Sequence, residues 1–127
     1  MSCSLEVLWS WGMTFTSRMD YRLNRAPDTH MSRYHRKLDA FHLRDSLVIG
    51  VYRATQTFPS DERFGLISQI RRASVSAAST IVEGCGRSTE QELIRYLDMS
   101  LGSLREVGYY LDLAVRLEFL SPEAARP

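Results

Sequence analysis

In the stretch 63–87, the residues that could bind a ligand are the glycines and the arginines. In the run GCGRST, Gly84 and Gly86 precede Ser88, and glycines that lead into a helix expose backbone N–H groups that can bind phosphate. A P-loop needs four residues between its glycines and a lysine after the second, and neither is present. The same residues suit a helix that ends in a left-handed glycine cap, followed by a helix capped by Ser88 or Thr89. We favour this structural interpretation.

The arginines of this region are candidate contacts to the phosphates of RNA or DNA. Residues 63–87 hold four basic residues against one acid, whereas residues 88–127 hold four against seven. The planar guanidinium suits phosphate, but it equally suits pairing with carboxylates, and a genomic preference for arginine codons would also explain why fifteen of the sixteen basic residues are arginine. The sequence leaves these alternatives open. The candidate nucleic-acid contacts are Arg63, Arg71, Arg72, Arg87 and Arg95.

Other kinds of site have little support. The chain has no GxSxG, HExxH, paired catalytic carboxylates or glycine-rich cofactor fingerprint, so we expect no enzyme, no cofactor and no small-molecule substrate. The three histidines have no carboxylate at metal-ligand spacing and are interpreted as solvated; they are His30, His35 and His42. Cys3 and Cys85 are interpreted as free thiols. Four aromatic residues are assigned to packing or to subunit interfaces, with base stacking as the alternative for the tyrosines: Tyr96, Tyr109, Tyr110 and Phe119.

The whole chain has the size and composition of one domain. It has 127 residues, 44% of them hydrophobic and 24% charged, and no run approaches the roughly 20 apolar residues of a membrane helix. We therefore expect a cytoplasmic protein. Residues 1–33 show no sustained period and are predicted to be an irregular extension, although Leu5 to Phe15 could fold back over the core. The helical domain is predicted over residues 34–120, with a short tail at 121–127.

The elements that position the arginines are three amphipathic helices. The first is predicted from Asp39, with one face made of Phe41, Val48, Val51, Tyr52 and Thr55 and broadened by Leu47 and Ala54. Pro59 ends that helix, and the acids Asp61 and Glu62 favour the start of the next.

Two longer helices repeat apolar or small residues at alternating spacings of three and four, which is typical of a bundle. The second helix places on this seam Ile67, Ile70, Ser74, Ala77, Ile81 and Gly84. The third places Leu93, Leu97, Ser100, Leu104, Val107 and Leu111, and should end near Leu117 because Pro122 blocks continuation. Residues beside these seams are candidate contacts between subunits: Val75, Ala78, Val82 and Tyr96.

FPSDERFGLISQIRRASVSAASTIVEGCGR, followed by TEQELIRYLDMSLGSLREV, resembles the four-helix-bundle family named for the intervening sequences of bacterial 23S ribosomal RNA. The resemblance runs from about Leu38 to Leu120. It implies an antiparallel up-down all-α bundle that assembles into homopentamers and has no established enzymatic activity. It also implies kinship with accessory proteins of retroelement reverse transcriptases, which bind nucleic acid.

The sequence departs from the family pattern in three places. Residues 77–82 replace a usual Ile-Pro-x-Asn-Ile-Ala run, which removes an asparagine amide, and Cys85 stands where an aromatic residue is frequent. The family's fourth helix should follow Leu120, where only SPEAARP remains, so we expect that helix to be missing or truncated. Three helices alone would leave an apolar strip open, and self-association is the expected remedy.

Overall fold

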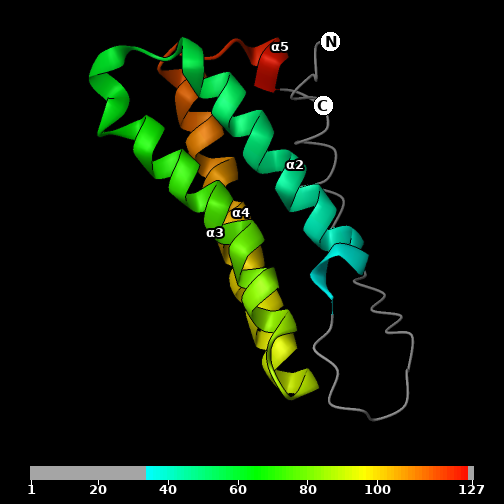
Figure 1. Cartoon of the computed structure of the whole chain (residues 1–127). Coiled ribbons are helices and arrows are strands. Elements are labelled where there is room, and N and C mark those ends of the chain that lie inside the picture. Colours follow the sequence, from blue (N-terminus) through cyan, green and yellow to red (C-terminus); the bar gives the residue numbers. More distant parts are fainter. Residues whose placement is uncertain (1–33, 126–127) are drawn as a thin grey trace.

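The computed structural model of the protein describes residues 34–125. This part of the chain is all helix and loop, with no strand: α2 spans Asp39–Ala54, α3 spans Leu66–Cys85, α4 spans Glu90–Arg116 and α5 spans Pro122–Ala125 (Figure 1). The predicted all-α antiparallel bundle is confirmed. The predictions for Leu5 to Phe15, His30 and Cys3 lie outside the described residues.

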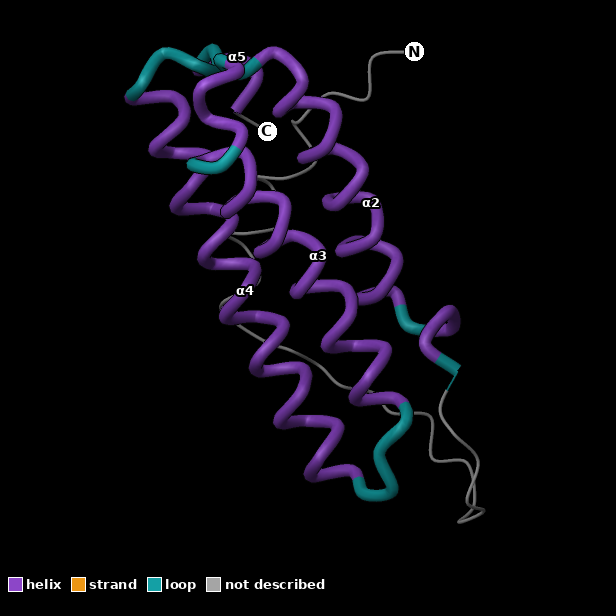
Figure 2. The backbone as a smooth tube through the Cα atoms, turned by 60° about the vertical axis from the view of Figure 1, so that its left-hand side comes forward, coloured by secondary structure: helices purple, strands orange, loops and turns teal. Residues whose placement is uncertain are grey.

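The three long helices run up, down and up (Figures 1 and 2). α3 and α4 form the longest hairpin of the fold, joined by the short turn 86–89, and α2 packs against α3. Between α2 and α3 the chain forms two 3₁₀ turns, Thr55–Thr57 and Ser60–Arg63, on either side of Pro59, which cannot continue a helix interior.

The predicted seams of the two long helices form the core. On α3 every member from Ile67 to Gly84 is buried, and on α4 all members are buried except Leu104, which is half-buried. The alternating spacing of three and four keeps these residues on one side of each helix, so the two seams face each other across the hairpin. α4 ends at Arg116, close to the predicted end.

The buried face of α2 was predicted only in part. Leu47, Val51 and Thr55 are buried as expected, but Tyr52 is 43% exposed. The largest difference is Arg44, which is only 5% exposed and belongs to the same buried row, three residues before Leu47. A charged residue on the core face was not anticipated, because burial of a guanidinium requires partners that only the tertiary structure supplies.

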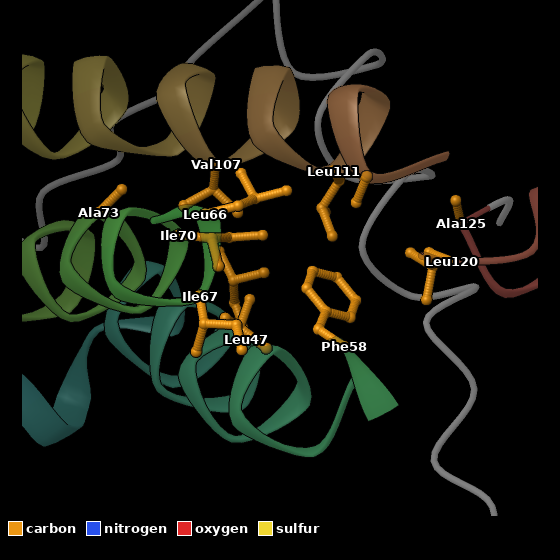
Figure 3. Packing of buried hydrophobic residues seen from close by; sticks show 12 residues of the cluster. Leu47, Phe58, Leu66, Ile67, Ile70, Ala73, Val107, Leu111, Leu120 and Ala125 are labelled. Atoms are coloured by element: carbon orange, nitrogen blue, oxygen red, sulfur yellow. The ribbon is translucent and has the colours of Figure 1, made fainter. Parts of the chain in front are cut away.

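A polar layer separates two apolar clusters of the core. One cluster gathers residues around Phe58 at the end where the α2–α3 connection and α5 lie (Figure 3). The other gathers Ile81, Cys85, Leu93 and Leu97 near the α3–α4 turn.

Between the two clusters, three helices meet through hydrogen bonds of buried groups. Arg44 of α2 donates through Nε to Ser100 Oγ of α4 at 3.2 Å, and Ser100 Oγ donates to the Ala77 carbonyl of α3 at 2.6 Å. The hydroxyl of Ser74, also fully buried, donates to the Arg71 carbonyl at 2.8 Å. We call Arg44, Ser74, Ala77 and Ser100 the polar layer.

Gly84 has a different role from the predicted left-handed cap. None of the described glycines has a positive φ; Gly84 lies inside α3, and Gly86 caps it with φ of −82°. A Cβ built at Gly84 would lie 2.7 Å from Cβ of Tyr96 and 3.2 Å from Cδ1 of Leu93. Glycine is therefore needed here so that the end of α3 can approach α4 closely.

The capping of α4 was predicted correctly at its start. Thr89 is the N-cap and accepts a hydrogen bond from the Glu92 backbone N–H at 3.2 Å, while its own hydroxyl donates to the Glu92 carboxylate at 3.1 Å. This satisfies one of the backbone donors that a helix leaves without a partner in its first turn.

The end of α4 carries the left-handed residue that the prediction placed on α3. Glu118 has φ of 60°, and the N–H groups of Glu118 and Phe119 donate to the carbonyls of Val115 and Ala114 in a Schellman motif. The predicted tail then holds α5, where Ser121 Oγ accepts from the Ala124 N–H at 3.1 Å and Ala125 joins the core.

Candidate nucleic-acid interface

The outer side of α3 carries an open hollow that contains three of the five candidate arginines. We call it the α3 hollow; its volume is about 770 Å³. Most of its lining comes from the N-terminal half of α3 and the turn before it, with Tyr52 of α2 on one flank and Glu106 of α4 on the other. Its charged members are Arg63, Arg71, Arg72 and Glu106, so three cations face one anion.

Arg71 is held in place on the α2 flank. Its Nε donates to Thr55 Oγ1 at 2.8 Å, and its Cζ lies 4.6 Å from the centroid of the Tyr52 ring. Thr55 is itself fixed, because its hydroxyl donates to the Val51 carbonyl at 2.9 Å. Arg71 therefore connects α3 to α2, and the same residue lines the α3 hollow.

Arg63 and Phe64 form the end of the hollow that precedes α3. Phe64 is 89% exposed, and the guanidinium of Arg63 lies 5.8 Å from its ring centroid. The turn is fixed by Glu62, whose carboxylate accepts a hydrogen bond from the Leu66 N–H at 2.8 Å and thereby caps α3. Because Phe64 is largely exposed, burial of apolar surface on folding does not explain the position of its ring.

Arg72 is exposed and lies on the side of α3 that faces α4. Glu106, on the α4 flank, accepts a hydrogen bond from the Tyr110 hydroxyl at 2.8 Å. That hydrogen bond raises the pKa of Tyr110, which the nearby positive charge of Arg72 opposes. Ser76 and Ser103 join the two helices next to this group through a 2.9 Å hydrogen bond.

The remaining two candidate arginines lie at the other end of the α3–α4 hairpin. Arg87 follows the end of α3, and its Cζ lies 4.6 Å from the centroid of the Tyr96 ring. Arg95 is exposed on the second turn of α4. The distance from Arg72 to the end of α3 at Cys85 is about 20 Å at 1.5 Å per residue, so the five arginines do not form one patch.

The candidate subunit contacts divide into two exposed and two packed residues. Val75 and Val82 are 42% and 39% exposed on the outer side of α3, and Val75 also lines the hollow. Ala78 is buried, and Tyr96 packs over Gly84 within the same chain. Of these four candidates, Val75 and Val82 are therefore the two that present substantial apolar surface.

Sites for metals are not found in the described part of the chain. Residues 34–125 contain no group of three or more histidine, cysteine, aspartate or glutamate side chains that could hold a metal ion. His42 Nε2 donates to the Arg36 carbonyl at 2.6 Å. In the same residues no helix is long and apolar enough to cross a membrane.

The sequence analysis missed two aromatic members of the hollow, Tyr52 and Phe64. Tyr52 was assigned to the core face of α2, although Val51 and Thr55 already fill that face. Phe64 precedes Gly65, the N-cap of α3, and so lies outside the helix and its seam. The pairing of an aromatic with the neighbouring Arg63 was the one signal in the sequence that pointed to this group.

The fold and the hollow together define a small antiparallel helical-bundle protein with an arginine-lined outer face. Residues 36–127 match the family described as 23S rRNA-intervening sequence protein, and the chain belongs to that family. The resemblance found in the sequence is thus confirmed. Comparison of the sequence with curated proteins found no match.

Proposed function

We propose that this protein is a non-enzymatic, homo-oligomeric bundle that binds nucleic acid through the α3 hollow. The observation that carries the proposal is the convergence of Arg63, Arg71 and Arg72 on one hollow in which Glu106 is the only acid among the described residues. Arginine is suited to phosphate because its donors form a planar fork.

The number of contacts fits weak and salt-dependent binding. Each phosphate that a side chain neutralises contributes about −0.9 to the slope of log K against log salt for duplex DNA and about −0.7 for single strands. Three arginines in one copy would give a slope of about −2 for single strands and about −3 for duplex DNA. An assembly that repeats the hollow would bind more tightly wherever one strand reaches several copies.

Filter binding of RNA and DNA at several salt concentrations tests this proposal. We expect Arg72→Ala and Arg63→Ala each to weaken binding similarly for unrelated sequences and to reduce the salt slope by somewhat less than about 1. Arg116→Ala is the matched control, since Arg116 pairs with Asp112 at 3.0 Å and lies outside the hollow. If neither RNA nor DNA is retained at about 0.15 M salt by the intact oligomer, the proposal fails.

Arg87 and Arg95 define how far the interface extends. Because they lie at the other end of the hairpin, their replacement should weaken binding of long strands but not of strands short enough to occupy the α3 hollow alone. A loss with short strands would show that the arrangement of the arginines differs from the one described.

Self-association is the second part of the proposal, with a pentamer as the form that the resemblance implies. Val82 supports it, because it is apolar, exposed on the outer side of α3 and outside the hollow; Val75 is exposed on the same side but lines the hollow. Light scattering over micromolar concentrations is the test, and a stable monomer would overturn it. A cytoplasmic location is proposed with it.

The alternative function is a structural or protein-binding module with no role for nucleic acid. The exposed apolar residues Val75, Val82 and Met99 favour it, since exposed apolar surface suits contact with another protein. If the oligomer is intact but retains neither RNA nor DNA in filter binding, this alternative is favoured.

A further inference from the structure

The α3 hollow combines fixed cations with exposed aromatic rings. Phe64 is 89% exposed and Tyr52 is 43% exposed, and both line the hollow beside Arg63 and Arg71. Grooves that bind single-stranded nucleic acid use this combination, in which cations follow the backbone and aromatic faces stack on bases. Double-stranded nucleic acid would leave these rings unused, because paired bases keep their faces stacked inside the helix.

We propose that the α3 hollow binds single-stranded nucleic acid and that an unpaired base stacks on Phe64. This inference rests on the proposed function, and it specifies which form of nucleic acid the hollow takes. Phe64 is the stacking platform because it is 89% exposed and the guanidinium of its neighbour Arg63 lies 5.8 Å from the ring centroid. Tyr52 is only 43% exposed, and the guanidinium of Arg71 lies closer to its ring, at 4.6 Å.

The cations of the hollow are placed to hold the backbone on either side of that base. Arg63 lies beside the Phe64 ring, and Arg71 is fixed by Thr55 and Tyr52, so little side-chain entropy remains to be lost on binding. Glu106 disfavours phosphate on the α4 flank, which directs the strand toward the α2 flank. From Ile67 to Ser79, the first and last α3 residues that line it, the hollow spans about 18 Å, enough for on the order of three or four nucleotides.

The test compares three labelled probes by fluorescence anisotropy: a twelve-nucleotide oligothymidylate, an abasic strand of the same length and charge, and a duplex of the same length. Because one stacked base contributes about 1–3 kcal/mol, the wild-type protein should bind the oligothymidylate at least about fivefold more tightly than the abasic strand. Phe64→Ala should abolish this difference while leaving the affinity for the abasic strand unchanged. Phe64→Trp should retain it.

Tyr109→Ala is the matched control, because Tyr109 is 57% exposed on α4 and lies outside the hollow. It should leave binding of all three probes unchanged. Circular dichroism is expected to show that both alanine variants remain folded, since each removes an exposed side chain.

Three results would overturn the inference in different ways. Equal affinity of wild type for the oligothymidylate and the abasic strand would show that phosphates alone are bound, so the proposed function would stand without stacking. Retention of no probe would remove the proposed function as well. A change in oligomeric state with unchanged binding for Phe64→Ala would place Phe64 at a contact between protein chains instead.

Discussion

Replacing Gly84 with alanine tests a close approach of α3 to α4. Gly84 lies near the end of α3, and an added Cβ would come within 2.7 Å of Tyr96 Cβ. A Cβ belongs to the rigid base of a side chain, so no rotamer change can relieve this contact and α3 must move away from α4. We therefore expect Gly84→Ala to destabilise the protein.

The magnitude follows from two opposing effects. Overpacking of a core contact costs about 1–3 kcal/mol, whereas glycine to alanine inside a helix gains about 0.5–1 kcal/mol from backbone entropy. The net expectation is a loss of up to about 2.5 kcal/mol in the free energy of unfolding. For a domain of this size each kcal/mol lowers the melting temperature by about 4–8 °C.

The chain provides two matched controls on α4. A Cβ at Gly102 or Gly108 would have no described atom within 4 Å, so alanine at either position should gain the helix-propensity term and raise the stability by about 0.5–1 kcal/mol. Two controls are useful because a contact between copies would affect them unequally.

Urea denaturation followed by circular dichroism, at one protein concentration for all variants, measures these differences. The sign of the change in the free energy of unfolding distinguishes the two expectations. If Gly84→Ala proves as stabilising as Gly102→Ala, α3 and α4 are not in close contact at this point and the assigned role of Gly84 is wrong.

Three further predictions follow from single residues. Ser100→Ala should lower the free energy of unfolding by about 1–3 kcal/mol, because Nε of the buried Arg44 loses the Ser100 hydroxyl as acceptor. Urea denaturation measures this loss, and an unchanged stability would contradict the importance of the polar layer. Glu118→Gly should stabilise by about 0.5–1 kcal/mol, because glycine adopts the φ of 60° without strain; an unchanged melting temperature would argue against it. Glu106→Gln should lower the pKa of Tyr110 toward its ordinary value, because the hydrogen bond to the carboxylate, which favours the protonated phenol, is weakened. Tyrosinate would then form at lower pH, which NMR titration of labelled tyrosine measures. An unshifted titration would refute the contact.

The sequence predicted the parts of this fold that depend on local periodicity. The seams of α3 and α4 alternate apolar and small residues at spacings of three and four, and residues so spaced must share a helix face whatever surrounds them. Thr89 with Glu92 was recognisable for the same reason, because a helix cap involves only residues within one turn.

Tertiary contacts decided what the sequence could not. Arg44 is buried because α4 supplies the Ser100 hydroxyl 56 positions away, and no residue near Arg44 in the sequence indicates that partner. Gly84 was interpreted as a cap because local rules favour glycine at helix ends, whereas its neighbour in space is Tyr96. The α3 hollow was equally hidden, since it joins Tyr52 of one helix to arginines of another.

The polar layer, together with the short turn 86–89, favours one alignment of the hairpin over similar ones. The seam of α4 repeats Leu93, Ser100 and Val107 at intervals of seven, so sliding α4 by one heptad, about 10 Å, would still place most apolar residues opposite apolar residues. Such a slip would separate Ser100 from the Ala77 carbonyl and from Arg44, and each buried polar group left without its partner costs about 1–3 kcal/mol. The apolar clusters supply the attraction between the helices, and three hydrogen-bonding groups in the middle select the one register in which they pair.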